Sequence, residues 1–409
     1  MGGSDQAKDR PTPRRLRRRS AMLILLALVA LLLLSMIADR LLPTLGVQLD
    51  RPTRLTFPPN VVVDQPKLEY RYTLRTNHLG LRDPERPFEK PTGVTRVILL
   101  GDVQTAGMAV PAEQTFAALL EKATTNTQFI NCGKPWANVL HQLRILYHVG
   151  LRYQPDRVLL CISADELGDM PWKDIKDLFQ LPPRDPTLSE RLWPNLSAAT
   201  RAAEQRDQYT RDKQPFDFIE KIQKRAKKKG LPDSDIQQWT HTVARYPKLV
   251  QATGNHQFNG NILSFGLLWN RKWPDALDYN RDYKEQAWRN MRKAMAAIRT
   301  DLRLQLAVVF IPVRLQYSPE YQAFLQRLGM HVRPSWLTDR TRFQVQLGRW
   351  CGDHAVPFLD LTDAFRSHPT PDALSHKYGA ELTAQGHQLI ADRITAAWDS
   401  LAPAPTPNP

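Results

Sequence analysis

The sequence predicts an α/β protein: a three-layer α/β/α domain around a five-stranded, mainly parallel sheet, with an N-terminal transmembrane helix and a helical insertion. Three observations predict this. From Thr95 onwards, continuous apolar runs of strand length alternate with amphipathic helical segments. A long uncharged run lies near the N-terminus. The 409-residue chain is 42% hydrophobic and has ten tryptophans, which is enough for a large buried core.

Residues 21–38 form the uncharged run, roughly 27 Å of helix at about 1.5 Å per residue. Residues 1–20 are a basic tail that ends in five arginines within six positions. This charge predicts a single-pass signal anchor in the cell membrane, with a cytoplasmic N-terminus and an extracytoplasmic main domain. A cleaved signal peptide is the alternative, but the run is long for one and residues 35–38 make a poor cleavage site. The net charge of +15 therefore implies no nucleic-acid partner.

Residues 39–94 are rich in proline and β-formers, which indicates a stalk and lead-in with short strands near 61–63 and 69–74. Residues 95–401 carry the main α/β pattern. The expected strands are 96–100, 128–131, 157–162, 305–311 and 356–361. The expected helices are 113–123, 138–153, 283–299, 321–328, 339–352 and 383–401.

An insertion at residues 166–280 interrupts this alternation, and residues 402–409 form a proline-rich disordered tail. A basic run in the insertion predicts a solvated helix face, with anionic lipid or an acidic polymer as the alternative partner. Its members are Lys221, Lys224, Arg225, Lys227, Lys228 and Lys229. The insertion's tryptophans are expected to pack it against the sheet, or else to line a sugar site. They are Trp172, Trp193, Trp239, Trp269 and Trp273.

Ligands of parallel sheets bind at the carboxyl ends of the strands. This rule selects the turn at 101–103, the segment 164–166 and the loop after Ile311. The three cysteines have no metal-ligand spacing, and those at 132 and 161 fit buried free thiols. No cofactor and no metal is expected.

Five segments resemble, in order, the sequence blocks of SGNH (GDSL-like) hydrolases. They are residues 77–83 (NHLGLRD), 96–107 (RVILLGDVQTAG), 129–136 (FINCGKPW), 157–165 (RVLLCISAD) and 381–391 (ELTAQGHQLIA). The resemblance spans about residues 70–400 and implies the SGNH/flavodoxin-like sheet. It also implies structural roles for Asp102, in the first turn, and for His387, in the last helix.

The family cleaves esters with a serine, a histidine base oriented by an aspartate, and an oxyanion hole that includes glycine and asparagine donors. At the matching positions this chain has Val103 for serine, Trp136 for glycine, Ala164 for asparagine, Tyr378 for aspartate and Glu381 for histidine. Losing the serine and the histidine alone costs on the order of 10⁶-fold in rate in other serine hydrolases. The sequence therefore predicts a protein that has lost the family chemistry.

The expected remnant is a vestigial cleft of Asp102, Val103, Trp136, Ala164 and Glu381. We expect the last four to converge, with Trp136 filling the space of a substrate carbonyl. Burial should raise the pKa of Glu381, unless Gln104 or another donor bonds its ionised form.

Chemistry could instead have moved to Ser163, Asp372 and His376, the last two as a displaced acid–base pair. Two functions follow. The first is a non-catalytic, membrane-anchored protein that binds a ligand or partner in the cell envelope, an acylated polysaccharide being one candidate. The alternative is an active esterase or acyl-transferase acting on an acylated carbohydrate or lipid.

Overall fold

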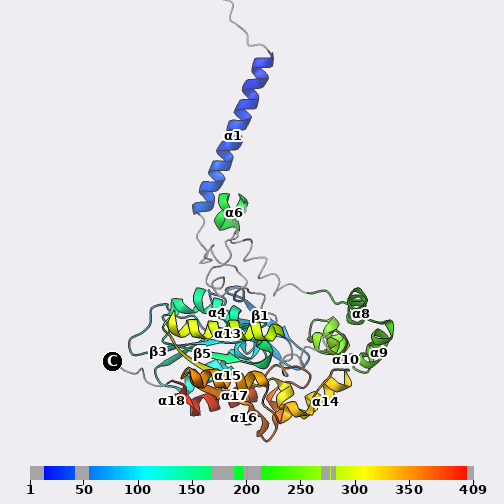
Figure 1. The fold of residues 1–409 in the computed structure, drawn as a ribbon. Helices are drawn as coiled ribbons and strands as arrows, with labels where there is room; N and C mark the ends of the chain where they lie inside the picture. The colour runs from blue at the N-terminus through cyan, green and yellow to red at the C-terminus, as the bar shows by residue number, and fades with distance from the viewer. Residues whose placement is uncertain are drawn as a thin grey trace, which may run out of the picture. The chain divides into compact units, whose positions relative to one another are not determined.

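The computed structural model describes residues 13–41, 55–167, 188–197, 200, 213–268, 277 and 282–402. The chain divides into two compact units (Figure 1). Unit 1 consists of Met1–Arg51 and Pro183–Gln205, and unit 2 of Pro52–Pro182 and Arg206–Pro409. The expected insertion is therefore shared between the two units.

Unit 1 contains the long helix α1 (Pro13–Leu41) and the short helix α6 (Leu188–Leu192). Within α1, the segment Met22–Leu41 has a mean hydropathy of 2.7 and is long and apolar enough to cross a membrane. It begins one residue later than expected and ends three residues later. Almost all its side chains are exposed, as in a helix that has no protein around it.

Unit 2 is built on the expected five-stranded parallel sheet. Its strands, in the spatial order β4-β3-β5-β6-β7, are β3 (Thr95–Leu100), β4 (Thr127–Asn131), β5 (Arg157–Ile162), β6 (Gln305–Phe310) and β7 (Phe358–Asp360). All four pairings are parallel, and Leu99 lies opposite both Asn131 and Leu159. Strand β7 is shorter than the predicted 356–361, because only three of its residues pair with β6.

The sheet's two faces bury alternate side chains of β3, and helices cover both of them (Figure 1). Ile98 and Leu100 belong to a core with α4 (Val139–His148), α13 (Asp282–Thr300) and α15 (Arg342–Asp353). Val97 and Leu99 belong to a second core with α3 (Phe116–Ala123), α17 (Ala384–Ala396) and α18 (Trp398–Leu401). The three-layer α/β/α fold is confirmed.

Several expected helices begin or divide differently. The predicted 138–153 helix divides into α4 and the 3₁₀ helix η2 (Gly150–Tyr153). The predicted 383–401 helix divides into α17 and α18. Helix α3 begins after Thr115 and α15 after Thr341, because these threonine hydroxyls accept N–H bonds of the first turn. The remaining short elements are α2 (Val103–Ala106), α14 (Pro319–Arg327), α16 (Thr362–Arg366), η1 (Ala112–Gln114), η3 (Ala164–Leu167), η4 (Arg314–Gln316), η5 (Pro334–Leu337) and η6 (Pro371–Leu374).

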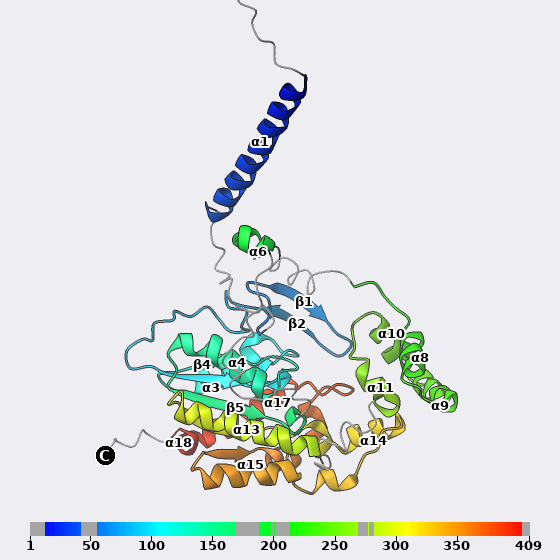
Figure 2. The same ribbon diagram turned by 45° about the horizontal axis from the view of Figure 1, so that its top comes forward.

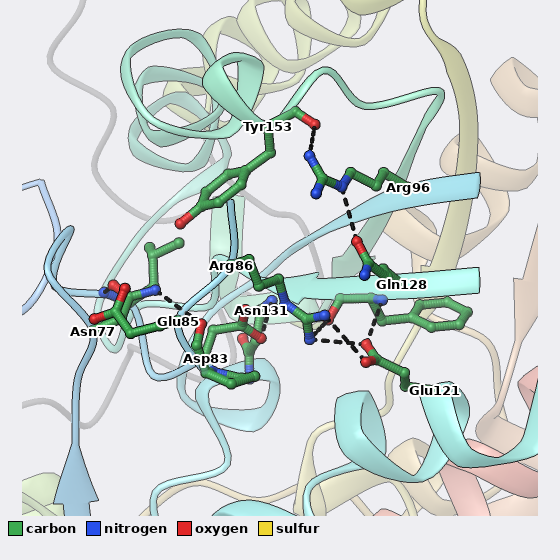
Figure 3. A network of polar contacts seen from close by, with 12 residues as sticks. Asn77, Asp83, Glu85, Arg86, Arg96, Glu121, Gln128, Asn131 and Tyr153 are labelled. Atoms are coloured by element: carbon green, nitrogen blue, oxygen red, sulfur yellow. Dashed lines mark hydrogen bonds and ion pairs between the residues drawn. The ribbon is translucent and has the colours of Figure 1, made fainter. Parts of the chain in front are cut away.

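The lead-in forms an antiparallel hairpin of β1 (Val62–Pro66) and β2 (Arg71–Arg75), followed by a segment fixed by buried charges (Figures 2 and 3). Arg86 bonds Asp83 at 2.7 Å and Glu121 of α3 at 2.9 Å. Asp83 also accepts the backbone N–H of Asn131 at 3.2 Å. Burial raises the pKa of Asp83 to about 6, although Arg86 opposes the rise. These contacts tie the lead-in to the carboxyl end of β4.

The arginine that begins the predicted first strand is fully buried. Arg96 donates to the carbonyls of Pro87, Phe88, Glu89 and Tyr153, at 2.7 to 3.1 Å. Figure 3 shows the bond to Tyr153. One guanidinium therefore satisfies carbonyls that converge on it from two chain segments.

In unit 2 the insertion forms α8 (Phe218–Lys228), α9 (Asp233–Ala244), α10 (Pro247–Gly254) and α11 (Asn261–Leu268), which gather at one end (Figure 2). The basic run is exposed, opposite the buried side chains of Phe218 and Ile222 on α8. Trp239 is buried and its indole N–H donates to Leu263 at 2.8 Å. Trp172, Trp269, Trp273 and the tail beyond residue 402 lie outside the described residues.

Candidate functional site

The turn after β3 forms the centre of the candidate site. Asp102 caps α2, and its Oδ1 accepts the N–H of Gln104 at 3.0 Å. This is the structural role expected of Asp102. Val103, which the sequence comparison predicts to replace the family's serine, is the first residue of α2. Its side chain has no atom that can attack a carbonyl carbon.

The neighbouring turn after β4 packs directly onto α2. Asn131 donates to the carbonyl of Thr105 and accepts the N–H of Gly133, both at 2.9 Å. A Cβ on Gly133 would lie 2.4 Å from the backbone nitrogen of Ala106, so only glycine fits there. At the other end of α2, Arg82 donates to the carbonyls of Ala106, at 2.9 Å, and Val110, at 2.6 Å. The backbone around Val103 is therefore held from both sides.

Trp136 does not fill the cleft, so that expectation is wrong. Its side chain is 79% exposed. Trp136 is the third residue of a four-residue turn, which is closed by a 3.1 Å hydrogen bond from the N–H of Ala137 to the carbonyl of Lys134. With Pro135 at the second position and a φ of 66° at Trp136, the turn is of the kind that favours glycine at this third position. The turn keeps a glycine backbone conformation but turns the indole towards solvent.

The segment after β5 has no oxyanion donor in its side chains at the matching position. Ala164 is fully buried at the start of η3, and its methyl group cannot donate. Ser163 is also buried, and its carbonyl accepts the N–H of Glu166 at 3.3 Å. The carboxylate of Glu166 accepts a 2.6 Å bond from Gln142 of α4.

Main-chain groups hold Glu381, the residue predicted to replace the family's histidine. Its Oε2 accepts the N–H of Ala380 at 3.1 Å, while Gln104 donates to the carbonyl of Ala380 at 2.9 Å. Burial raises the pKa of Glu381 as expected. Its own and Ala380's N–H groups, then Lys67 and Arg314, oppose the rise. Gln104 thus links the β3 turn to the last block without donating to the carboxylate.

The sequence reasoning missed two charged residues beside this segment. Glu69, in the β1–β2 turn, accepts the N–H of Tyr378 at 3.1 Å, and burial raises its pKa. Arg314 of η4 is buried and donates to the carbonyls of His376 and, at 2.8 Å, Gly379. Arg314 follows the loop after Ile311 that the strand-end rule selected. Nothing in the sequence pointed to Glu69, which lies more than 300 residues from its partner.

The two displaced acid–base candidates, Asp372 and His376, each contact another residue. Asp372 accepts a hydrogen bond from the hydroxyl of Ser318. The ring of His376 instead packs at a tilt against the ring of Tyr70, with centroids 4.4 Å apart. Burial and, after it, the charge of Arg314 lower the pKa of His376. The nearby Ser375 shares a 2.6 Å hydrogen bond with Tyr317. Ser163, after β5, belongs to a different segment from both.

Val103, Trp136 and Ala164 follow three neighbouring strands at one edge of the sheet, and Gln104 connects this edge to the segment of Glu381. His387 is buried against Phe116, whose N–H it accepts at 3.3 Å through Nδ1. Burial lowers its pKa to about 3. Its role is to pack α17 on α3. Within the described ranges, no group of three or more His, Cys, Asp or Glu side chains could hold a metal ion.

No protein-family profile and no curated protein matches the chain. Solved structures are similar in fold. One is a lipase/acylhydrolase from Enterococcus faecalis, at 13% identity and a TM-score of 0.35, covering 77% of this chain and 100% of that one. Another is a member of the lipolytic protein G-D-S-L family from Veillonella parvula, at 11% identity and a TM-score of 0.30, covering 75% and 98%. The fold assignment itself rests on the strand order.

Proposed function

We propose that the protein is a membrane-anchored, extracytoplasmic SGNH hydrolase-like protein that does not cleave esters and binds a ligand or partner in the cell envelope. One observation carries the proposal. The nucleophile position is Val103, and the base position is a glutamate whose carboxylate accepts main-chain N–H groups. A base at Glu381 has no hydroxyl at Val103 to activate.

The oxyanion positions support the same conclusion. The family's asparagine donor is replaced by the buried methyl of Ala164, a loss of about 10²–10³ in rate where one such donor is removed. The backbone of α2 is fixed by Asn131 and Arg82, so the turn is preserved although its nucleophile is absent. A backbone turn that is held in place but lacks the reacting side chains is suited to binding a ligand or partner without cleaving it.

Trp136 is the residue we assign to that binding. A non-glycine residue at φ 66° lowers the free energy of unfolding by about 1–2 kcal/mol. Because the indole of Trp136 is exposed, its burial offsets little of this loss. Strained, exposed residues of this kind are found at ligand and partner contacts. The flat face of an indole suits the ring of a sugar, which makes an acylated envelope polysaccharide the candidate ligand.

Helix α1 supports the proposed placement outside the cytoplasm. Its apolar segment, Met22–Leu41, is preceded by a run of arginines, which retains the N-terminus in the cytoplasm. Unit 2 follows the span and would therefore lie on the outer side.

Ester turnover tests the proposal. Full-length protein in lipid nanodiscs should give no turnover of p-nitrophenyl acetate above a protein-free control. The variant Val103→Ser should remain inactive, because Ala164 still supplies no oxyanion donor and the carboxylate of Glu381 is engaged by main-chain N–H groups in place of the family's histidine. Turnover that is present in the wild type and disappears in Ser163→Ala or His376→Ala would establish a displaced-site esterase instead.

A further inference from the structure

A segment from the middle of the insertion docks onto the C-terminal end of the apolar helix in unit 1. The carboxylate of Asp39 on α1 accepts the N–H of Leu196 at 2.8 Å and the N–H of Asn195 at 3.1 Å. Asn195 returns a bond from its side-chain amide to the carbonyl of Asp39 at 2.6 Å. More than 150 residues separate the partners, so these bonds define a tertiary contact.

Two further contacts extend this docking along the helix. The indole N–H of Trp193 donates to the hydroxyl of Ser35, one turn before Asp39, at 3.1 Å. Arg40 donates to the carbonyl of Arg191 at 3.5 Å. Residues 188–197, which we call the docked segment, are thus fixed to α1 at three successive points.

Asp39 lies inside the segment that is long and apolar enough to cross a membrane, yet its side chain is only 3% exposed. A carboxylate at a membrane boundary is costly unless its oxygens are hydrogen-bonded. The docked segment supplies those bonds from its own backbone. It must therefore be at the same depth as Asp39, close to the end of the span.

The docked segment also presents apolar side chains. Leu188 is 73% exposed and Leu196 is 53% exposed. Leucines and a tryptophan beside the end of a span are typical of a segment that lies in the lipid interface. The segment is hydrogen-bonded to the end of the apolar span, so the occupant that we assign to these exposed side chains is the bilayer.

We propose that residues 188–197 lie in the outer lipid interface, fixed there by Asp39. This inference rests on the proposed membrane anchoring. It gives the insertion a role: the chain passes between the two units after Arg51, after Pro182 and after Gln205, so three connections join unit 2 to the membrane unit.

Site-specific quenching tests the inference. Leu188→Cys in the full-length protein is labelled with a nitrobenzoxadiazole dye and reconstituted into phosphatidylcholine vesicles with and without doxyl-labelled lipid. The matched control is Lys224→Cys, on the exposed basic face of α8. The three native cysteines are buried, so in the folded protein the dye should react with the introduced cysteine. The Leu188 dye should lose about half of its emission to the doxyl lipid, while the control dye should be unaffected.

The added change Asp39→Ala should reduce quenching of the Leu188 dye, because the docked segment loses its attachment. Alkaline extraction of the same vesicles reports separately whether the protein is anchored. Anchored protein whose Leu188 dye is no more quenched than the control would overturn the inference and leave the anchoring intact. Unchanged quenching in Asp39→Ala would overturn the role of Asp39. A dye shielded from water but not quenched by lipid would identify a protein contact, such as a second copy, and would also overturn it.

Discussion

Replacing Trp136 with glycine should stabilise the protein relative to replacing it with alanine. The backbone at this position has φ 66°, which costs a non-glycine residue about 1–2 kcal/mol. Glycine removes that cost but adds about 0.5–1 kcal/mol of chain entropy to the unfolded state. The net gain of Trp136→Gly over Trp136→Ala is therefore about 0.5–1 kcal/mol. Both variants lose the same indole, so its packing does not enter the comparison.

The assay is urea denaturation of the full-length protein in nanodiscs, followed by far-UV circular dichroism, for the wild type and both variants. The wild type should be no more stable than the glycine variant, because an indole that is 79% exposed contributes little by burial. An alanine variant as stable as the glycine variant would show that the left-handed backbone is not under strain. A glycine variant that is less stable than the wild type by 2 kcal/mol or more, about the value of a fully buried large side chain, would show that the indole is packed.

Three further predictions concern the core, the acid response and the topology. Arg96→Met should destabilise unit 2 by about 1–3 kcal/mol in urea denaturation, because four backbone carbonyls, of which that of Tyr153 is buried, lose a charged donor; a loss below about 1 kcal/mol would show that water replaces it. The pKa of His387 falls from 6.5 to about 3 on folding, so the unfolded state binds the proton first and stability declines as the pH falls from 6.5 to 3, by roughly 4–5 kcal/mol in total. The variant His387→Gln keeps a hydrogen-bond acceptor but does not titrate in this range, so its stability should decline less with falling pH than that of the wild type. Identical pH profiles of stability would show that His387 is not the group responsible. A reporter that is active only in the cytoplasm, fused after Pro409, should remain silent, and activity there would reverse the proposed topology.

The strands were predictable because a parallel sheet covered on both faces needs continuous apolar runs, and residues 97–100 and 158–162 are such runs. Helix ends were less predictable. The local pattern continues through Val149, whereas the structure divides the helix there into α4 and η2. Hydrophobic pattern reports which face is buried, but it does not report where the hydrogen-bond ladder changes.

The candidate site was predictable at the turns that follow the strands and unpredictable elsewhere. The positions of Val103 and Ala164 follow from the strand ends. The exposure of Trp136 depends on its turn, and residue type alone suggested a buried ring. Glu69, between β1 and β2, and Arg314, in η4, form hydrogen bonds to the segment just before residues 381–391. Contacts between segments so far apart in the chain leave no pattern in a single sequence.

We propose that this fold has the frame of a serine hydrolase without a reactive serine. Labelling of the full-length protein in its native membrane with a fluorophosphonate probe tests it most directly. We expect no covalent adduct, in the wild type as in Ser163→Ala, because Val103 has no hydroxyl group and Ser163 is buried. An adduct on the folded wild-type protein that a single Ser→Ala change abolishes would contradict it.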